Sequence, residues 1–208
     1  MLIRVKVCGI TRLEDALTAV RYGANAIGFV FWNKSARFVD PQVARKIVRD
    51  LPPFVCVVGV YVDPSFEWVE ETSAIAGLNL IQFHGDESPE FCNRCSLPYI
   101  KAVRVKSESD LLQYASQHSN SSGLLLDSYV EGVPGGTGRT FKWNLIPKKL
   151  PLPLILSGGL NAENICVAMK EVKPWAVDVS SGVEITKGIK DADKVAAFMR
   201  GVRNGEKL

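Results

Sequence analysis

The chain has 208 residues, of which 47% are hydrophobic and 23% are charged, a composition typical of one folded globular domain. Its 25 basic and 22 acidic residues are spread along the chain and give a net charge of only +3, so we expect no nucleic-acid partner and no membrane surface. No run approaches the roughly eighteen apolar residues of a membrane span, and Arg4 and Lys6 interrupt the amino-terminal apolar run. Five cysteines, an odd number in a chain long enough to fold without disulfides, predict a reduced, cytoplasmic protein.

Apolar runs and amphipathic stretches alternate from one end of the chain to the other. The apolar runs predict eight strands, at residues 3–8, 26–31, 55–62, 78–83, 99–105, 123–127, 153–156 and 176–179. They are largely continuous, as in strands that are buried on both faces of a parallel sheet. Such a sheet is either open and doubly wound or closed. Eight strands about 26 residues apart favour a single-domain α/β fold, a parallel (β/α)8 TIM barrel over residues 1–208.

The starts of several helices are predicted from capping patterns. Thr11 and Glu14 have the spacing of a capping box. Asp40 and Asp63 each precede a proline, which suits the first turn of a helix. Apolar stripes at helical spacing predict further helices near residues 165–172 and 195–202.

In a barrel, the reactive residues gather where strands end and the following loops begin. The predicted strand ends carry Cys8, Asp127 and two short turns at residues 157–159 and 180–182. Arg37 in the second loop, His84 after the fourth strand and Asp178 in the eighth strand are further candidates.

The two turns favour a phosphate site. One contains Gly158 and Gly159 ahead of a helix expected near Asn161, and the other, SSG, ends with Gly182. Glycine lets backbone N–H groups approach an anion, and the loops after strands seven and eight form the usual phosphate site of barrels. Either turn alone could be an ordinary tight connection, but two in adjacent units favour phosphate binding. The stretch PGGTGRT at 134–140 lacks the lysine and spacing of a P-loop, and we interpret it as a flexible loop near the substrate.

Cys8 and Asp127 each have two interpretations. A cysteine after an apolar strand is either a small core residue or a reactive thiol, exposed by the following Gly9 and close to its backbone donors. Asp127 is either a turn cap or a general acid. The residues alone leave both questions open.

The remaining cysteines and the second histidine are interpreted as structural. Cys92 and Cys95 form a C-x-x-C pair in a helical stretch without a second pair, so ordinary helix cysteines are favoured over a zinc or redox site. Cys56 and Cys166 are predicted in the core and His118 in a solvated polar run. We therefore predict no metal site.

Seven motifs in one order resemble the phosphoribosylanthranilate isomerase family of tryptophan biosynthesis. They are VKVCGIT from residue 5, KSARFV from 34, IQFHGDE from 81, LLLDS from 124, GGTGRTFKW from 135, LSGGLNAEN from 156 and VDVSSGVE from 177. The resemblance implies a (β/α)8 barrel, no metal and no cofactor, and the sequence leaves monomer and homodimer as alternatives. It also implies the Amadori rearrangement of N-(5-phosphoribosyl)anthranilate to 1-(2-carboxyphenylamino)-1-deoxyribulose 5-phosphate.

The resemblance further assigns roles to residues. Cys8 matches the general base, Asp127 the general acid, and Arg37 the arginine that holds the anthranilate carboxylate. Gly158, Gly159, Ser180, Ser181 and Gly182 match the phosphate-binding turns, while His84 and Asp178 match active-site positions with no assigned role. Ala36 and Phe38 replace a proline and a tyrosine of the family, which predicts a looser second loop with one hydrogen bond fewer.

Three other functions are alternatives to this assignment. A pentose-phosphate epimerase needs metal-binding histidines, and the chain has only two histidines. An indole-glycerol-phosphate synthase needs a catalytic lysine at strand ends that instead carry Cys8 and Asp127. A non-catalytic barrel that binds a sugar phosphate would be expected to lack one of these two groups.

Overall fold

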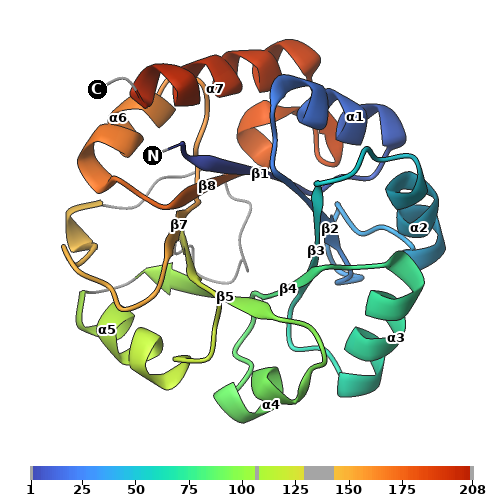
Figure 1. Ribbon diagram of the computed structural model, residues 1–208, viewed down its shortest axis with the longest axis horizontal. Coiled ribbons are helices and arrows are strands. Elements are labelled where there is room, and N and C mark those ends of the chain that lie inside the picture. Colours follow the sequence, from blue (N-terminus) through green and yellow to red (C-terminus); the bar gives the residue numbers. More distant parts are fainter. Residues whose placement is uncertain (1, 106–107, 129–142, 207–208) are drawn as a thin grey trace.

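The fold is a closed barrel of eight parallel strands surrounded by helices (Figure 1). The computed structural model describes residues 2–105, 108–128 and 143–206. Each strand pairs with the next, and β8 pairs with β1 to close the ring. The strands are β1 (Arg4–Cys8), β2 (Ala26–Val30), β3 (Cys56–Tyr61), β4 (Leu80–Phe83), β5 (Tyr99–Val105), β6 (Leu124–Ser128), β7 (Leu154–Leu156) and β8 (Ala176–Val179). All eight predicted strands are present, so the barrel is confirmed and the open sheet is excluded.

Helices cover the outer face of the barrel (Figure 1). They are α1 (Leu13–Tyr22), α2 (Pro41–Arg49), α3 (Phe66–Ala76), α4 (Pro89–Arg94), α5 (Glu108–Gln117), α6 (Ile165–Val172) and α7 (Ala192–Gly205). The alternation is imperfect in two places. The described residues between β6 and β7 form only a 3₁₀ turn, η1 (Trp143–Leu145), and β8 is followed by the 3₁₀ turn η2 (Ser181–Val183) and a hairpin of β9 (Glu184–Thr186) and β10 (Ile189–Lys190).

One of the three predicted caps is confirmed. Asp40 accepts a hydrogen bond from the Gln42 N–H (2.8 Å), and Pro41 is the first residue of α2. A carboxylate at this position satisfies a backbone donor that the helix itself leaves unpaired.

The other two predicted caps are wrong because tertiary partners take the side chains. The Thr11 hydroxyl donates to the Gly188 carbonyl (2.5 Å), and α1 begins after Arg12 without a side-chain cap. Asp63 accepts from the Asp86 N–H (2.7 Å) and so connects the loops after β3 and β4, while Ser65 caps α3.

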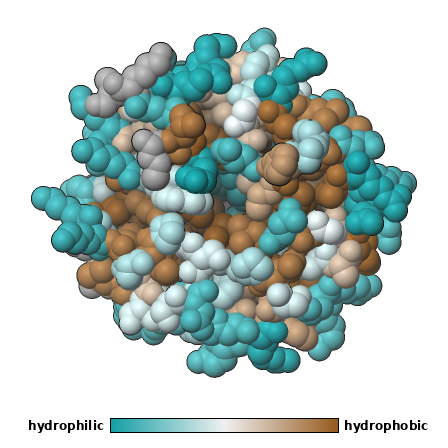
Figure 2. Space-filling view, viewed as in Figure 1, coloured by the Kyte–Doolittle hydropathy of each residue, from teal (hydrophilic) through white to brown (hydrophobic). Residues whose placement is uncertain are grey.

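Among the described residues, the buried apolar side chains form four clusters. Large side chains such as Phe29, Tyr61 and Phe83 fill the layer between strands and helices. A second cluster from β5 to β8, with Ile100 and Leu125 among its members, lies apart from that layer and fills the barrel interior. From the side of Figure 1, strongly hydrophilic residues lie mainly around the periphery and apolar residues closer to the centre (Figure 2).

The two ends of the described chain lie side by side. The Ile3 N–H donates to the Glu206 carboxylate at 2.6 Å, and both termini appear beside α6 and α7 (Figure 1). Within the described ranges no helix has the length and apolar character required to cross a membrane.

Candidate active site

A cavity of about 230 Å³ lies at the carboxyl ends of the strands. Its walls come from alternate strand positions, because alternate side chains of a strand face the same side. All of the predicted site residues except Gly182 line it: Cys8, Arg37, His84, Asp127, Gly158, Gly159, Asp178, Ser180 and Ser181. Residues that are more than 170 positions apart in the chain therefore share one pocket, as the barrel prediction requires.

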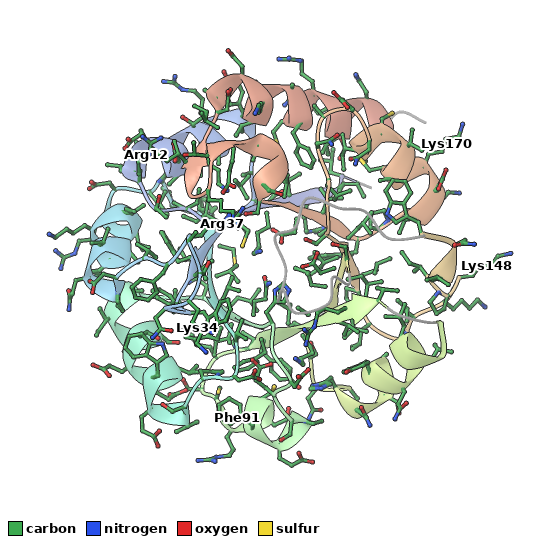
Figure 3. All side chains as sticks on the ribbon, turned by 180° about the vertical axis from the view of Figure 1, so that it is seen from behind. Arg12, Lys34, Arg37, Phe91, Lys148 and Lys170 are labelled. Carbon is green, nitrogen blue, oxygen red and sulfur yellow. The ribbon has the colours of Figure 1, made fainter. Side chains whose placement is uncertain are left out.

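Arg37 lies near the middle of the barrel when it is viewed from behind, whereas Arg12, Lys148 and Lys170 lie at its periphery (Figure 3). Its guanidinium donates from Nε and Nη2 to the two carboxylate oxygens of Glu184, at 2.8 and 2.7 Å. A Cβ added to Gly9 would lie 2.5 Å from the Arg37 Cδ, so the glycine after Cys8 provides the space that Arg37 occupies. The two hydrogen bonds to the Glu184 carboxylate hold the Arg37 guanidinium in one orientation at the cavity wall.

Glu184 also binds a fully buried lysine. Lys190 donates to the Glu184 carboxylate (2.9 Å) and to the Cys8 carbonyl (2.5 Å), so the β9–β10 hairpin is attached to the end of β1. Burial opposes ionisation of Glu184, but the bonds from Arg37 and Lys190 outweigh it and hold the pKa of Glu184 below its ordinary value. Glu184 is therefore an anion between two cations.

The Cys8 side chain is in contact with the cavity and is almost fully buried. Burial raises the pKa of its thiol above the ordinary value, while the charges of Lys6 and Lys190 act in the opposite direction. The backbone donors expected from Gly9 are not available to it, because the N–H groups of Gly9 and Ile10 both donate to the Gly28 carbonyl (2.9 and 3.0 Å). Charged side chains, not backbone dipoles, therefore surround the thiol.

Asp178 forms a buried ion pair on the neighbouring strand. Its Oδ1 is 2.8 Å from the Lys6 Nζ, and both side chains are more than 90% buried. The Ser157 hydroxyl lies 3.4 Å from the other oxygen. Asp178 thus lines the cavity and also pairs with Lys6 on β1.

Asp127, His84 and Gln82 form a hydrogen-bonded chain on the opposite wall. The His84 Nε2 lies 3.1 Å from Asp127 Oδ2, and its Nδ1 lies 2.9 Å from the Gln82 amide nitrogen. With the amide donating to Nδ1, the imidazole carries its proton on Nε2 and donates it to Asp127. Asp127 Oδ1 accepts the backbone N–H of Ser128 (2.8 Å), so the carboxyl group has a fixed direction.

The glycine turns after β7 and β8 pack against each other at the cavity. Gly158 has a φ of 84° and Gly159 a φ of 67°, in the left-handed region that favours glycine. A Cβ on Gly182 would lie 1.9 Å from the Leu160 carbonyl oxygen, so only glycine permits this contact. In the part of the chain that the structure describes, the N–H groups of Gly159, Ser181 and Gly182 are used by no hydrogen bond. These donors remain available to an anion.

Several functional residues were missed by the sequence analysis. Lys6 lies two residues before Cys8 on β1, and Gln82 on β4 lies two residues before His84, which directly follows that strand. This spacing of two was the available signal. Glu184 and Lys190 had no comparable signal, because their roles depend on a hairpin that brings them to β1 and Arg37. Further lining residues not predicted are Trp32, Lys34, Ser35, Ala36 and Lys187.

The remaining cysteine and histidine predictions have mixed outcomes. Burial raises the pKa of Cys92 to about 12 and of Cys95 to about 11, and both are free thiols on α4 and at its end, as predicted. Cys166 and Cys56 are half-buried, so the prediction that both are core residues was wrong.

His118 is buried, and the prediction of a solvated side chain was wrong, because its ring stacks on Tyr114 with centroids 6.3 Å apart. Among residues 2–105, 108–128 and 143–206, no cluster of three metal-ligating side chains is found. The 134–140 loop lies outside the described residues.

Comparisons with known proteins identify the family of this chain. The family model of N-(5'phosphoribosyl)anthranilate (PRA) isomerase matches residues 5–201. The chain belongs to this isomerase family. The N-(5'-phosphoribosyl)anthranilate isomerase of Nitrosospira multiformis is 68% identical to it over 208 residues, which is 100% of both chains.

Solved structures of the isomerase family have the same fold. The phosphoribosyl anthranilate isomerase of Thermotoga maritima is 43% identical, with a TM-score of 0.89 over 99% of this chain and 100% of that chain. Another isomerase was solved in complex with reduced 1-(o-carboxyphenylamino)-1-deoxyribulose 5-phosphate. It is 40% identical, with a TM-score of 0.82 over 99% of this chain and 100% of that chain. The resemblance drawn from the seven sequence motifs is therefore confirmed.

The second loop carries Arg37 between Ala36 and Phe38, the two positions where the sequence predicts a looser loop. Ala36 lines the cavity, and Phe38 is about one-third exposed, so its ring is not part of the core. The loop is held by a hydrogen bond from the Arg37 N–H to the Ser35 hydroxyl (3.1 Å) and by bonding of Val39 N–H to the Val30 carbonyl. Arg37 thus has local support without a proline at position 36.

Proposed function

We propose that the protein isomerises N-(5'-phosphoribosyl)anthranilate to 1-(2-carboxyphenylamino)-1-deoxyribulose 5-phosphate in tryptophan biosynthesis, with Cys8 as general base and Asp127 as general acid. Membership of the isomerase family and the shared cavity support this proposal. The observation that carries it is that a thiol and a carboxyl group line the same pocket as two glycine turns with free backbone donors.

The first step is opening of the ribose ring. Asp127 in its acid form gives its proton to the ring oxygen, the bond from that oxygen to C1 breaks, and the anthranilate nitrogen lone pair forms a C=N double bond. His84 and the Ser128 N–H fix the direction of the carboxyl group, so its proton reaches one atom of the bound sugar. The resulting Asp127 carboxylate accepts the hydrogen bond from His84.

The second step is removal of the proton from C2. Cys8 as thiolate takes this proton, the electron pair of the C–H bond forms the C1=C2 double bond, and the C=N electrons return to nitrogen. The enolamine then gains a proton at C1 and loses the hydroxyl proton at C2, which yields the ketone. Cys8 forms no covalent bond to the substrate and acts only by proton transfer.

The two ends of the substrate match the two charged parts of the pocket. The phosphate matches the turns with Gly158, Gly159, Ser180, Ser181 and Gly182. Lys187 adds a positive charge elsewhere in the lining of the same cavity. The anthranilate carboxylate matches Arg37, whose orientation is held by Glu184.

The test is turnover by the purified protein, followed as the loss of phosphoribosylanthranilate fluorescence. Cys8→Ala and Asp127→Asn should each lower kcat by about 10²–10⁴-fold, the usual contribution of one acid–base group. Cys166→Ala, at a half-buried thiol on α6, and Asp50→Asn, at an exposed carboxyl after α2, are the matched controls and should keep full activity. Turnover within a few-fold of wild type in either site variant removes that residue from the mechanism.

Arg37→Leu addresses the binding role. Loss of the guanidinium should raise KM more than it lowers kcat, because the carboxylate contact exists in both ground and transition states. Unchanged KM and kcat would show that the carboxylate binds elsewhere.

The finer assignments of location and assembly belong to this proposal. The five cysteines are free thiols, which fits a reducing compartment such as the cytoplasm. The protein should work as a monomer or homodimer on a small-molecule substrate, without nucleic acid, and light scattering of the purified protein measures the assembly state.

A further inference from the structure

Lys6 is a buried cation that the proposed mechanism does not use. It lies two residues before Cys8 on β1, and only 7% of its side chain is exposed. Taking a lysine ammonium out of water is costly unless a partner compensates. A lysine kept in the interior of the barrel directly below the active-site cavity therefore needs an explanation.

The end of the Lys6 side chain and the Cys8 sulfur lie next to the same point of the neighbouring strand, Gly28. A Cβ added to Gly28 on the neighbouring strand would lie 2.9 Å from the Cys8 Sγ and 3.2 Å from the Lys6 Cε. Both side chains thus extend over the bare backbone of Gly28. The missing side chain at this position allows the lysine and the sulfur to come together.

The lysine remains charged in this environment. Although burial lowers the pKa of Lys6, the attraction of Asp178 and Cys8 outweighs it, so its pKa lies above the ordinary value. The 2.8 Å contact with Asp178 fixes the ammonium group in place. The Asp178 carboxylate in turn opposes a negative charge on Cys8.

We propose that Lys6 is a positioning residue for the Cys8 base, whose ammonium charge stabilises the thiolate and is held in place by Asp178. The charged groups that act on Cys8 are Lys6 from β1, Asp178 from β8, Lys190 from β10 and Arg37 from the second loop. Lys190 and Arg37 share the single negative charge of Glu184, whereas Lys6 differs from both in lying with the Cys8 sulfur over the backbone of Gly28. This inference rests on the proposed role of Cys8, but it makes a statement about the thiol that is testable without substrate.

The test is a thiolate titration of the free protein by ultraviolet absorbance near 240 nm. Each protein is compared with the same protein that also carries Cys8→Ala, so the difference reports Cys8 alone. Lys6→Met removes the charge at similar volume and should raise the pKa of Cys8 by about one pH unit or more, the effect of losing a close opposite charge. Lys101→Met is the matched control, because Lys101 on β5 is equally buried in an ion pair with Glu87 at 2.8 Å and should leave the pKa of Cys8 unchanged.

A second variant keeps Lys6 and should change the pKa of Cys8 in the opposite direction. Asp178→Asn keeps the size of the side chain but removes the negative charge, so the pKa of Cys8 should fall. If Lys6→Met does not fold, this arm decides the question alone. An unchanged pKa of Cys8 in Lys6→Met, or a raised pKa in Asp178→Asn, overturns the proposal.

Kinetics link the titration to catalysis. In Lys6→Met the acidic limb of the kcat/KM profile should move to higher pH by the same amount as the thiol pKa, whereas a structural role would lower activity equally at all pH values. Lys6→Arg retains the charge and should restore the profile. If the wild-type protein does not turn over phosphoribosylanthranilate, the proposed function fails while the titration still decides whether Lys6 acts on Cys8.

Discussion

Replacing Glu184 by glutamine tests whether its negative charge holds Arg37 and Lys190 in place. Glu184 accepts hydrogen bonds from Arg37, Lys190 and the Gly188 N–H, and its own side chain is 5% exposed. Glutamine keeps the shape and one acceptor oxygen but leaves two buried cations without a counter-charge. Arg37 is then free to leave its orientation at the cavity wall.

The size of the effect follows from the burial of the partners. Lys190 is 0% and Arg37 12% exposed in their side chains, so little solvent screens either charge. Breaking a buried ion pair on one side costs about 3–5 kcal/mol, and the retained acceptor favours the lower end of that range. At about 2–4 °C per kcal/mol for a domain of this size, the melting temperature should fall by about 6–12 °C. Because Arg37 loses its fixed orientation, KM should rise about tenfold, with a smaller change in kcat.

The assay combines thermal unfolding by circular dichroism with steady-state kinetics, and Glu171→Gln on the exposed side of α6 is the matched control. The pH dependence of the folding stability gives an independent check that the Glu184 carboxylate is stabilising. The pKa of Glu184 is depressed in the folded state, so its stabilisation is present above its ordinary value of 4.5 and is lost as the pH falls through the folded-state pKa. The stability difference between wild type and Glu184→Gln should therefore shrink on acidification. A loss below about 1 kcal/mol at pH 7 together with an unchanged KM would refute the reasoning.

Three further predictions concern other parts of the site. Gln82→Leu removes the donor to His84 Nδ1 and should lower kcat by about tenfold or more with little change in KM, and equal kcat in steady-state assays would contradict this. Gly158→Ala forces an unfavourable φ and brings a Cβ within 2.5 Å of a backbone nitrogen. The free energy of unfolding, measured with denaturant, should therefore fall by more than about 1–2 kcal/mol, and KM should rise. Wild-type values of both quantities would show that this turn tolerates a side chain. Changing both Cys92 and Cys95 to alanine should leave turnover unchanged, with or without a chelator. A melting temperature that depends on added zinc in the wild-type protein but not in this double variant would support the zinc alternative.

The fold was predictable because buried parallel strands have a strong local signal. Continuous apolar runs with regular spacing marked all eight strands, with ends within a few residues of those observed. The predicted caps at Thr11 and Asp63 failed for the opposite reason. Each side chain had a favourable local use, but a loop distant in sequence offered a better partner, Gly188 for Thr11 and Asp86 for Asp63.

The gathering of the predicted residues at one cavity was predictable from the sequence, but their electrostatic partners were not. Strand ends and glycine turns pointed to Cys8, Asp127 and the turn glycines, because parallel strands direct their carboxyl ends to one side of a barrel. The sequence indicated no partner for Arg37, which depends on the β9–β10 hairpin. It also suggested backbone donors for the thiol, and these proved to be engaged with Gly28.

By itself, the amino-acid sequence determined the periodicity, the number of strands and the kinds of reactive group at their ends, because these depend on neighbours a few residues apart. Only the tertiary structure decided which charges meet: Lys6 with Asp178 across 172 positions, and Arg37 with Glu184 across 147. The physical reason is that a charge is stabilised by its distance to a partner and by the exclusion of water, and barrel closure sets both. The acidity of a buried thiol is therefore a property of the closed barrel and not of the local sequence around Cys8.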